Sequence, residues 1–189
     1  MPGRPAHRPS ARESMLAAAE TQLRLAGTVS LDSAARAAGV TKPGLMYHFG
    51  TKQDLMTALL DRMMTRHEEA LARRLARLAG TRDPLQATVQ HRLAAYVTWV
   101  CTAEFDGADL VMFADPRLRD TLTAAWIERL RPWLAVPANL SGDRQARLLS
   151  ARLLADGVWL AGAGGSLSMT RSQKRSVKQV ALELIAGAQ

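Results

Sequence analysis

The sequence predicts an all-α protein of about nine helices, in which a small N-terminal three-helix unit precedes a larger helical region. Three observations support this fold class. Apolar residues recur at the three-to-four-residue spacing of helices, and capping residues or glycines punctuate the chain between these segments. No stretch alternates apolar and polar residues with the period of two that indicates a half-buried strand.

The chain begins with a proline- and arginine-rich stretch, residues 1–9, which we expect to be a disordered basic arm. The first helix then opens at the capping box Ser10-x-x-Glu13, because a serine hydroxyl and a carboxylate three residues later can satisfy each other's backbone amides. Gly27 is expected to end this helix.

Two short helices joined by a glycine turn follow. Ser30 can cap the first of them, and Gly39 supplies the positive φ that a helix C-terminus favours. Thr41 can cap the second, Pro43 is tolerated in its first turn, and we expect it to stop at His48-Phe49. This pattern is typical of a helix-turn-helix, whose second helix enters the major groove of DNA.

The remaining helices are predicted from their own start and stop signals. Thr51-x-x-Asp54 caps a long fourth helix that meets no glycine or proline before Gly80. Asp83-Pro84 starts the next segment, since proline is favoured at the first helical position. Further helices are expected to about residue 101, over 110–113, from 115 to a bend or end at Pro132, over 141–161, and from Thr170 or Ser172 to the C-terminus.

The helix-turn-helix region resembles the TetR family of bacterial transcriptional regulators. The family pattern is matched by Ala35, Ala38, Gly39, Val40, Thr41, Lys42, Leu45, Tyr47, His48, Phe49 and Lys52. Pro43 and Met46 depart from the residues that the family often has there, glycine and tyrosine. The resemblance covers roughly residues 10–60, and beyond them it extends to length and helical layout.

The resemblance implies a domain organisation and a partner. Residues 10–50 would form the DNA-binding domain, 51–79 a connecting helix, and 80–189 a ligand-binding and dimerisation domain. The last two helices would pair with those of a second copy as a four-helix bundle. We expect the small residues Ala151, Ala155 and Ala161 to permit close packing in that bundle.

Several residues of the recognition helix suit contact with DNA. Thr41, Tyr47 and His48 carry donors or acceptors on short reaches suited to phosphates and base edges, and Lys42 and Lys52 supply positive charge at either end of the helix. With what the resemblance implies, the candidate DNA-binding residues are Ser30, Thr41, Lys42, Gly44, Met46, Tyr47, His48 and Lys52. Leu45 and Phe49 are expected to be core residues instead. The alternative for the polar residues is a solvated helix face.

The candidate ligand-binding residues combine aromatic rings with carboxylates, which suits a cationic lipophilic molecule. They are His67, Trp99, Asp109, Phe113, Trp126, Asp156 and Trp159. Part of this region is also similar to the branch of the TetR family that senses such drugs. Core packing is the alternative for each tryptophan, pairing with Arg152 for Asp156, and helix capping for Asp106 and Asp115.

The composition of the chain favours some classes of function and argues against others. The net charge of +8 suits a polyanionic partner, although arginine-rich proteins are often simply basic. Cys101 is the only cysteine, so no intrachain disulfide can form, and a cytoplasmic protein is expected. No apolar run is long enough to span a bilayer. We find no glycine-rich loop after a strand, HExxH helix or nucleophile motif, and expect neither enzyme activity nor a cofactor.

Histidines do not alter this interpretation. His67 and His91 stand apart without the paired spacing of metal motifs, so we expect a core or pocket position for His67 and a surface position for His91. The sequence therefore predicts a dimeric repressor that binds a palindromic operator and is released by a small molecule, such as a cationic multidrug-type ligand. A regulator that is constitutive or controlled by a protein partner, and a basic membrane-surface protein, remain alternatives.

Overall fold

A computed structural model describes residues 10–188 of the chain, so the predicted basic arm of residues 1–9 lies outside the described range. Within that range the protein contains eight α-helices and two short 3-10 helices and no strand, which confirms the all-α prediction. The helices are α1 (Ala11–Ala26), α2 (Leu31–Ala37), α3 (Lys42–Met46), α4 (Lys52–Ala79), η1 (Pro84–Gln86), α5 (Val89–Thr102), η2 (Gly107–Phe113), α6 (Arg119–Leu134), α7 (Gly142–Ala163) and α8 (Arg171–Ala186).

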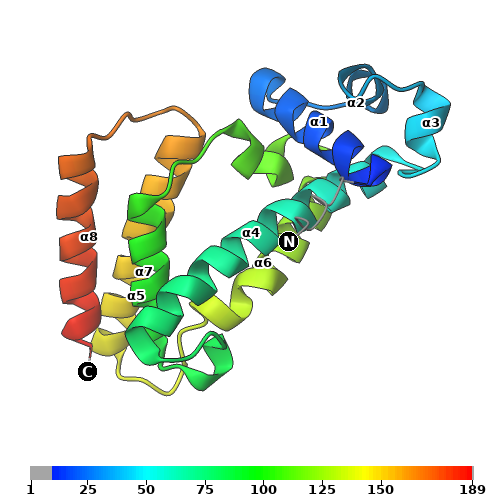
Figure 1. The fold of residues 1–189 in the computed structure, drawn as a ribbon. Coiled ribbons are helices and arrows are strands. Elements are labelled where there is room, and N and C mark those ends of the chain that lie inside the picture. The colour runs from blue at the N-terminus through cyan, green and yellow to red at the C-terminus, as the bar shows by residue number, and fades with distance from the viewer. Residues whose placement is uncertain (1–9, 189) are drawn as a thin grey trace, which may run out of the picture.

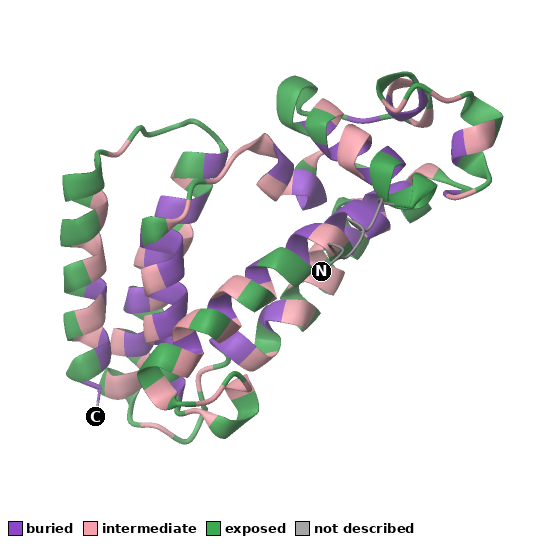
Figure 2. Cartoon of the chain, in the orientation of Figure 1, coloured by how far each residue is buried: buried purple, intermediate pink, exposed green. Residues whose placement is uncertain are grey.

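Two groups of helices are joined by α4. Helices α1, α2 and α3 lie at one end of α4, and α5, α7 and α8 lie side by side at the other, with α6 running along α4 (Figure 1). Helix α5 packs against α4, α6, α7 and α8, and its inner face is buried along most of its length (Figure 2). Because α4 belongs to both groups, its position is coupled to the packing of each.

The predicted starts of the first four helices are confirmed, and so are the predicted ends of α1, α2 and α4. Thr51 and Asp54 form the reciprocal capping box that begins α4, with both bonds close to 3 Å. Gly27, Gly39 and Gly80 follow α1, α2 and α4 with φ between 67° and 70°. No other residue type between 10 and 188 has positive φ, so these glycines occupy the positions where a side chain would be strained.

Several predicted boundaries differ in the structure. The segment that starts at Pro84 is only the short helix η1, and α5 begins at Val89, where Thr88 caps it. Helix α3 ends at Met46, and Tyr47 and His48 form a turn. Helix α6 begins at Arg119 and not at Asp115, because the Asp115 carboxylate instead accepts the backbone amide of Arg117 and closes a local turn. Pro132 lies inside the last turn of α6, where one lost hydrogen bond does not end the helix.

The predicted role of the small residues in α7 is wrong for two of them. Ala151 and Ala155 are fully buried in the core of their own chain, so they cannot line an interface with a second copy. Ala161 is half-buried. The opposite face of α7 carries three exposed leucines, Leu149, Leu153 and Leu160.

No helix within residues 10–188 combines the length and apolar character needed to cross a membrane.

Candidate nucleic-acid interface and regulatory pocket

Helix α3 is fixed in the N-terminal unit by one buried face and a capped start. The Thr41 hydroxyl accepts the backbone amide of Gly44 at 3.2 Å. Leu45 and Phe49 are buried in the core, which confirms the prediction for both residues. The guanidinium of Arg12 lies over the Phe49 ring, 4.8 Å from its centroid. This anchoring sets the direction of the side chains on the outer face.

The outer face contains most of the predicted DNA-binding residues. Tyr47 is the most prominent, with 87% of its surface exposed and its ring edge-on to His48 at 5.1 Å between centroids. The exposed residues are Ser30, Thr41, Lys42, Met46 and Tyr47, and the half-buried ones are Gly44, His48 and Lys52. The structure therefore brings aromatic and hydroxyl groups together on the surface around α3.

Both predicted lysines form ion pairs that the sequence did not reveal. The Lys42 ammonium lies 3.0 Å from the carboxylate of Asp32, and both side chains are about half exposed, so water and salt screen this pair. The Lys52 ammonium lies 2.5 Å from the Asp115 carboxylate, which is much less exposed. The hydrogen bond from Lys52 lowers the pKa of Asp115, and the Arg117 amide adds to the effect.

Asp115 is one of three carboxylates on and beside η2 that form ion pairs or hydrogen bonds with residues of α1 and α4. Asp106 pairs with Arg24 of α1 at 2.5 Å, and the same hydrogen bond raises the Arg24 pKa. Asp109 meets His67 of α4 at 3.0 Å. We call Asp106, Asp109 and Asp115 the acidic clasp. It ties η2 to α1, to the middle of α4 and to the first residue of α4.

Beside the clasp the structure brings together three of the predicted ligand-binding residues, His67, Trp99 and Asp109. The Trp99 ring lies 4.7 Å from His67 and 5.2 Å from Phe105, the latter edge-on. These side chains line an open pocket of about 290 Å³, called the regulatory pocket for the role proposed for it below. Its walls also include Glu20, Arg24, Arg66, Ala103, Glu104, Asp106 and Ala108.

The other predicted ligand-binding residues do not line this pocket. Trp126 and Trp159 stack on each other with centroids 5.8 Å apart. Asp156 accepts the Tyr96 hydroxyl at 2.6 Å and pairs with Arg152, which is the structural alternative considered for it. Phe113 is partly exposed on η2. Burial, and then the nearby Asp156 charge, raise the pKa of Tyr96, so its hydroxyl stays protonated and donates.

Comparison with known proteins decides the nature of the N-terminal unit. Residues 16–59 match the family model described as bacterial regulatory proteins, tetR family. These residues form a TetR-family DNA-binding domain. TetR-family proteins are DNA-binding transcription factors rather than enzymes, and this chain is accordingly a DNA-binding regulator.

A solved structure extends the likeness to the whole fold. The chain is similar to the crystal structure of AmtR from Mycobacterium smegmatis, with a TM-score of 0.58 and 20% sequence identity. The superposition covers 98% of this chain and 89% of the AmtR chain. At that identity the match supports the TetR-type fold alone. None of the curated proteins compared with the sequence matches it.

Proposed function

We propose that this TetR-family protein is a repressor that binds a palindromic operator as a homodimer and is released by a small molecule. The observation that carries the proposal is the surface around α3, where Tyr47 stands exposed above the buried Leu45 and Phe49. Residues 10–50 would read DNA, 51–79 would connect, and 80–189 would bind ligand and the second copy.

The proposed operator contacts divide into two kinds. Tyr47 and Met46 are exposed beside the half-buried Gly44 around the recognition helix, where close approach to base edges and sugars is possible. Ser30, Thr41, Lys42, His48 and Lys52 would position the protein through phosphates. Lys42 and Lys52 would exchange their present carboxylate partners for phosphate oxygens, so each contact competes with an existing ion pair.

Exposed leucines support the proposed homodimer. Leu149, Leu153 and Leu160 recur at four- and seven-residue intervals and therefore form one stripe on α7. Val180 adds an exposed apolar residue on α8. Since TetR regulators typically form homodimers, a second copy of α7 and α8 is the proposed cover for this surface.

The charge of the regulatory pocket supports a cationic, aromatic ligand. Four carboxylates and two guanidinium groups line it, which leaves a formal charge of −2 with His67 neutral. The faces of Trp99 and Phe105 can hold a cation through their π-systems. A ligand there would touch Asp106 and Asp109 of the acidic clasp, and would act only if it bound the DNA-incompetent arrangement better.

The proposal is tested by selecting an operator from random double-stranded DNA and measuring its affinity by fluorescence anisotropy. Cationic dyes are then added, with neutral and anionic dyes as controls. We expect cations alone to release the operator, and Trp99→Phe to weaken this response. Operator binding that no dye alters would reject the small-molecule mechanism and favour a constitutive or protein-controlled regulator. Absence of any selected sequence would reject the proposed function itself.

Loss of the Lys52 partner should strengthen operator binding. In Asp115→Asn, Lys52 no longer has to leave a carboxylate before it meets a phosphate. A partly exposed ion pair is worth about 0.2–1 kcal/mol, and a dimer contains two, so operator affinity should rise about 2- to 30-fold. Asp143→Asn removes an exposed acid of α7 and serves as the control. Equal affinities of the two variants, measured by anisotropy, would show that Lys52 does not compete in this way.

A further inference from the structure

The N-terminal half of α8 carries four basic residues on one side. Arg171, Lys174, Arg175 and Lys178 follow the i, i+3, i+4, i+7 spacing of a single helix face. Farther along α8, the residues in line with Lys174 and Lys178 are Ala181 and Ile185, and both are buried. The same side of α8 is therefore apolar and packed on the core near the C-terminal end of the helix, and basic near its N-terminal end.

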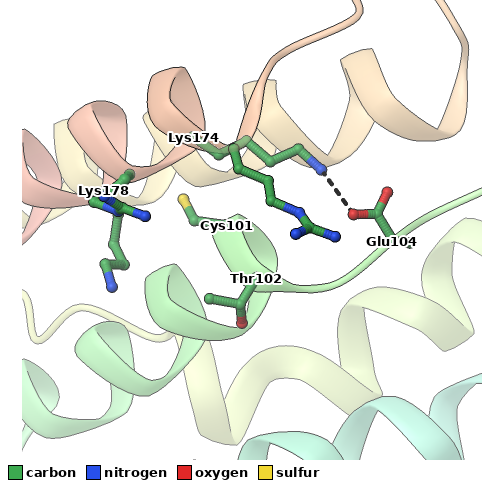
Figure 3. A pocket seen from close by; sticks show the side chains of 7 residues that line it. Cys101, Thr102, Glu104, Lys174 and Lys178 are labelled. Carbon is green, nitrogen blue, oxygen red and sulfur yellow. Dashed lines mark ion pairs between the residues drawn. The ribbon is translucent and has the colours of Figure 1, made fainter.

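This basic side faces α5 across a pocket. The pocket has a volume of about 420 Å³, within the range of small-molecule sites. It is lined by Cys101, Thr102, Glu104, Arg171, Lys174, Arg175 and Lys178 (Figure 3). Four bases against one carboxylate give it a formal charge of +3.

The positive charges are poorly compensated by the protein. Lys174 reaches Glu104 at 3.7 Å, but the Glu104 side chain is 89% exposed, so solvent weakens the pair. Within residues 10–188, no ion pair joins Arg171, Arg175 or Lys178 to an acid. The C-terminal end of α5 offers the equivalent of about half a negative charge, a small fraction of what four cations would attract.

We propose that this pocket binds a small polyanion, a metabolite with two or more negative charges on phosphate or carboxylate groups. Arg171 and Arg175 supply planar donor forks that suit both oxyanions, and Lys174 and Lys178 add charge from the deeper side. A single negative charge would leave most of the repulsion among the four bases in place.

The site is separate from the surfaces used in the proposed function. Val180 of the proposed dimer face lies about 160° around the α8 axis from Lys178, so a second copy on that face leaves the pocket open. The regulatory pocket has the opposite charge and shares only Glu104 with this one. Polyanion binding is therefore an activity in addition to operator binding and cation response.

The test measures binding to the full-length protein without DNA, by calorimetry at constant ionic strength. Tripolyphosphate and citrate are the probes, and acetate is the singly charged control. We expect saturable binding of one polyanion per chain and little affinity for acetate. Preference for tripolyphosphate would identify a phosphorylated ligand, and preference for citrate a polycarboxylate. No saturable binding of either probe, or equally tight binding of acetate, would overturn the proposal.

Variants locate the binding. K174Q/K178Q should weaken polyanion affinity roughly ten-fold or more, because it removes two charge-assisted contacts. K174R/K178R keeps the charge and should retain binding. R77Q/R82Q removes two exposed bases from another part of the surface and should behave as wild type. Unchanged affinity in K174Q/K178Q would place the anion elsewhere, for example on the DNA-binding surface, and would overturn the assignment.

Cys101 gives an independent measurement at the site. It is the only cysteine and lines the pocket, so its alkylation by iodoacetamide reports on this location alone. Only 7% of its surface is exposed and burial raises the pKa of its thiol, so the labelling is slow, and in each protein the rate with the polyanion is compared with the rate without it. Tripolyphosphate or citrate, whichever binds, should slow the labelling in wild type and in K174R/K178R, but not in K174Q/K178Q. Equal protection in all three proteins would contradict a site formed by Lys174 and Lys178.

Discussion

Replacing Tyr47 with alanine is expected to weaken operator binding strongly. A lost base contact costs about 1–3 kcal/mol, and a homodimer loses it in both half-sites, so affinity should fall roughly 30-fold to more than 10⁴-fold. The protein itself should remain folded, because 87% of the Tyr47 surface is exposed and its ring meets only the edge of His48. Fluorescence anisotropy with the selected operator measures the change.

Two comparisons separate the role of the ring from that of the hydroxyl and from general effects. Tyr47→Phe retains the ring and should restore the part of the affinity that comes from stacking or apolar contact. Leu85→Ala removes an equally exposed apolar side chain on η1 and should bind the operator as wild type does. Wild-type affinity in Tyr47→Ala would mean that the surface around α3 does not carry the operator contact.

The sequence predicted the N-terminal unit well because its determinants are local. The helix caps are hydrogen bonds that Thr41, Thr51 and Asp54 accept from backbone amides three residues away. The glycine turn depends only on the positive φ of Gly39 itself. Such local contacts can be predicted from the spacing of a few neighbouring residues. The dense matches to the TetR pattern lie in the same stretch, and the family model covers it.

The acidic clasp was not predictable in the same way. Asp115 lies 63 residues beyond Lys52 in the chain, and their contact depends on how η2 packs against α1 and α4. Helix capping was the alternative considered for Asp106, which does cap η2, but the sequence did not indicate its partner Arg24. It also did not indicate that Asp109 completes this capping box or that its partner is His67. The sequence shows that a carboxylate is charged. Which residue it pairs with depends on tertiary packing and cannot be predicted from local spacing.

The small residues of α7 show how a local pattern can mislead about a face. Ala151 and Ala155 are compatible with close packing on any neighbour, and the structure places them inside their own chain. The spacing of Leu149, Leu153 and Leu160 was the better signal, since these leucines lie about 160–180° around α7 from Ala151. Large apolar residues on the outer side are the ones that require a cover.

Replacing Leu153 with glutamate should therefore dissociate the proposed homodimer. Leu153 is 67% exposed in the single chain and lies at the centre of the leucine stripe, so the variant should fold normally while a charge is forced into the dimer interface twice. A central interface residue costs about 2 kcal/mol or more when lost, and two copies imply a dimer dissociation constant raised roughly 10³-fold. Sedimentation equilibrium measures this change directly.

Operator binding should fail in the same variant for a geometric reason. Each chain carries one recognition helix, so a monomer can contact one half-site only and loses the gain of binding both together. Leu85→Glu places the same charge on an exposed leucine of η1 and should leave both the dimer and operator affinity unchanged. If Leu153→Glu remained a dimer with full operator affinity, the two copies would have to meet through a surface other than the leucine stripe of α7.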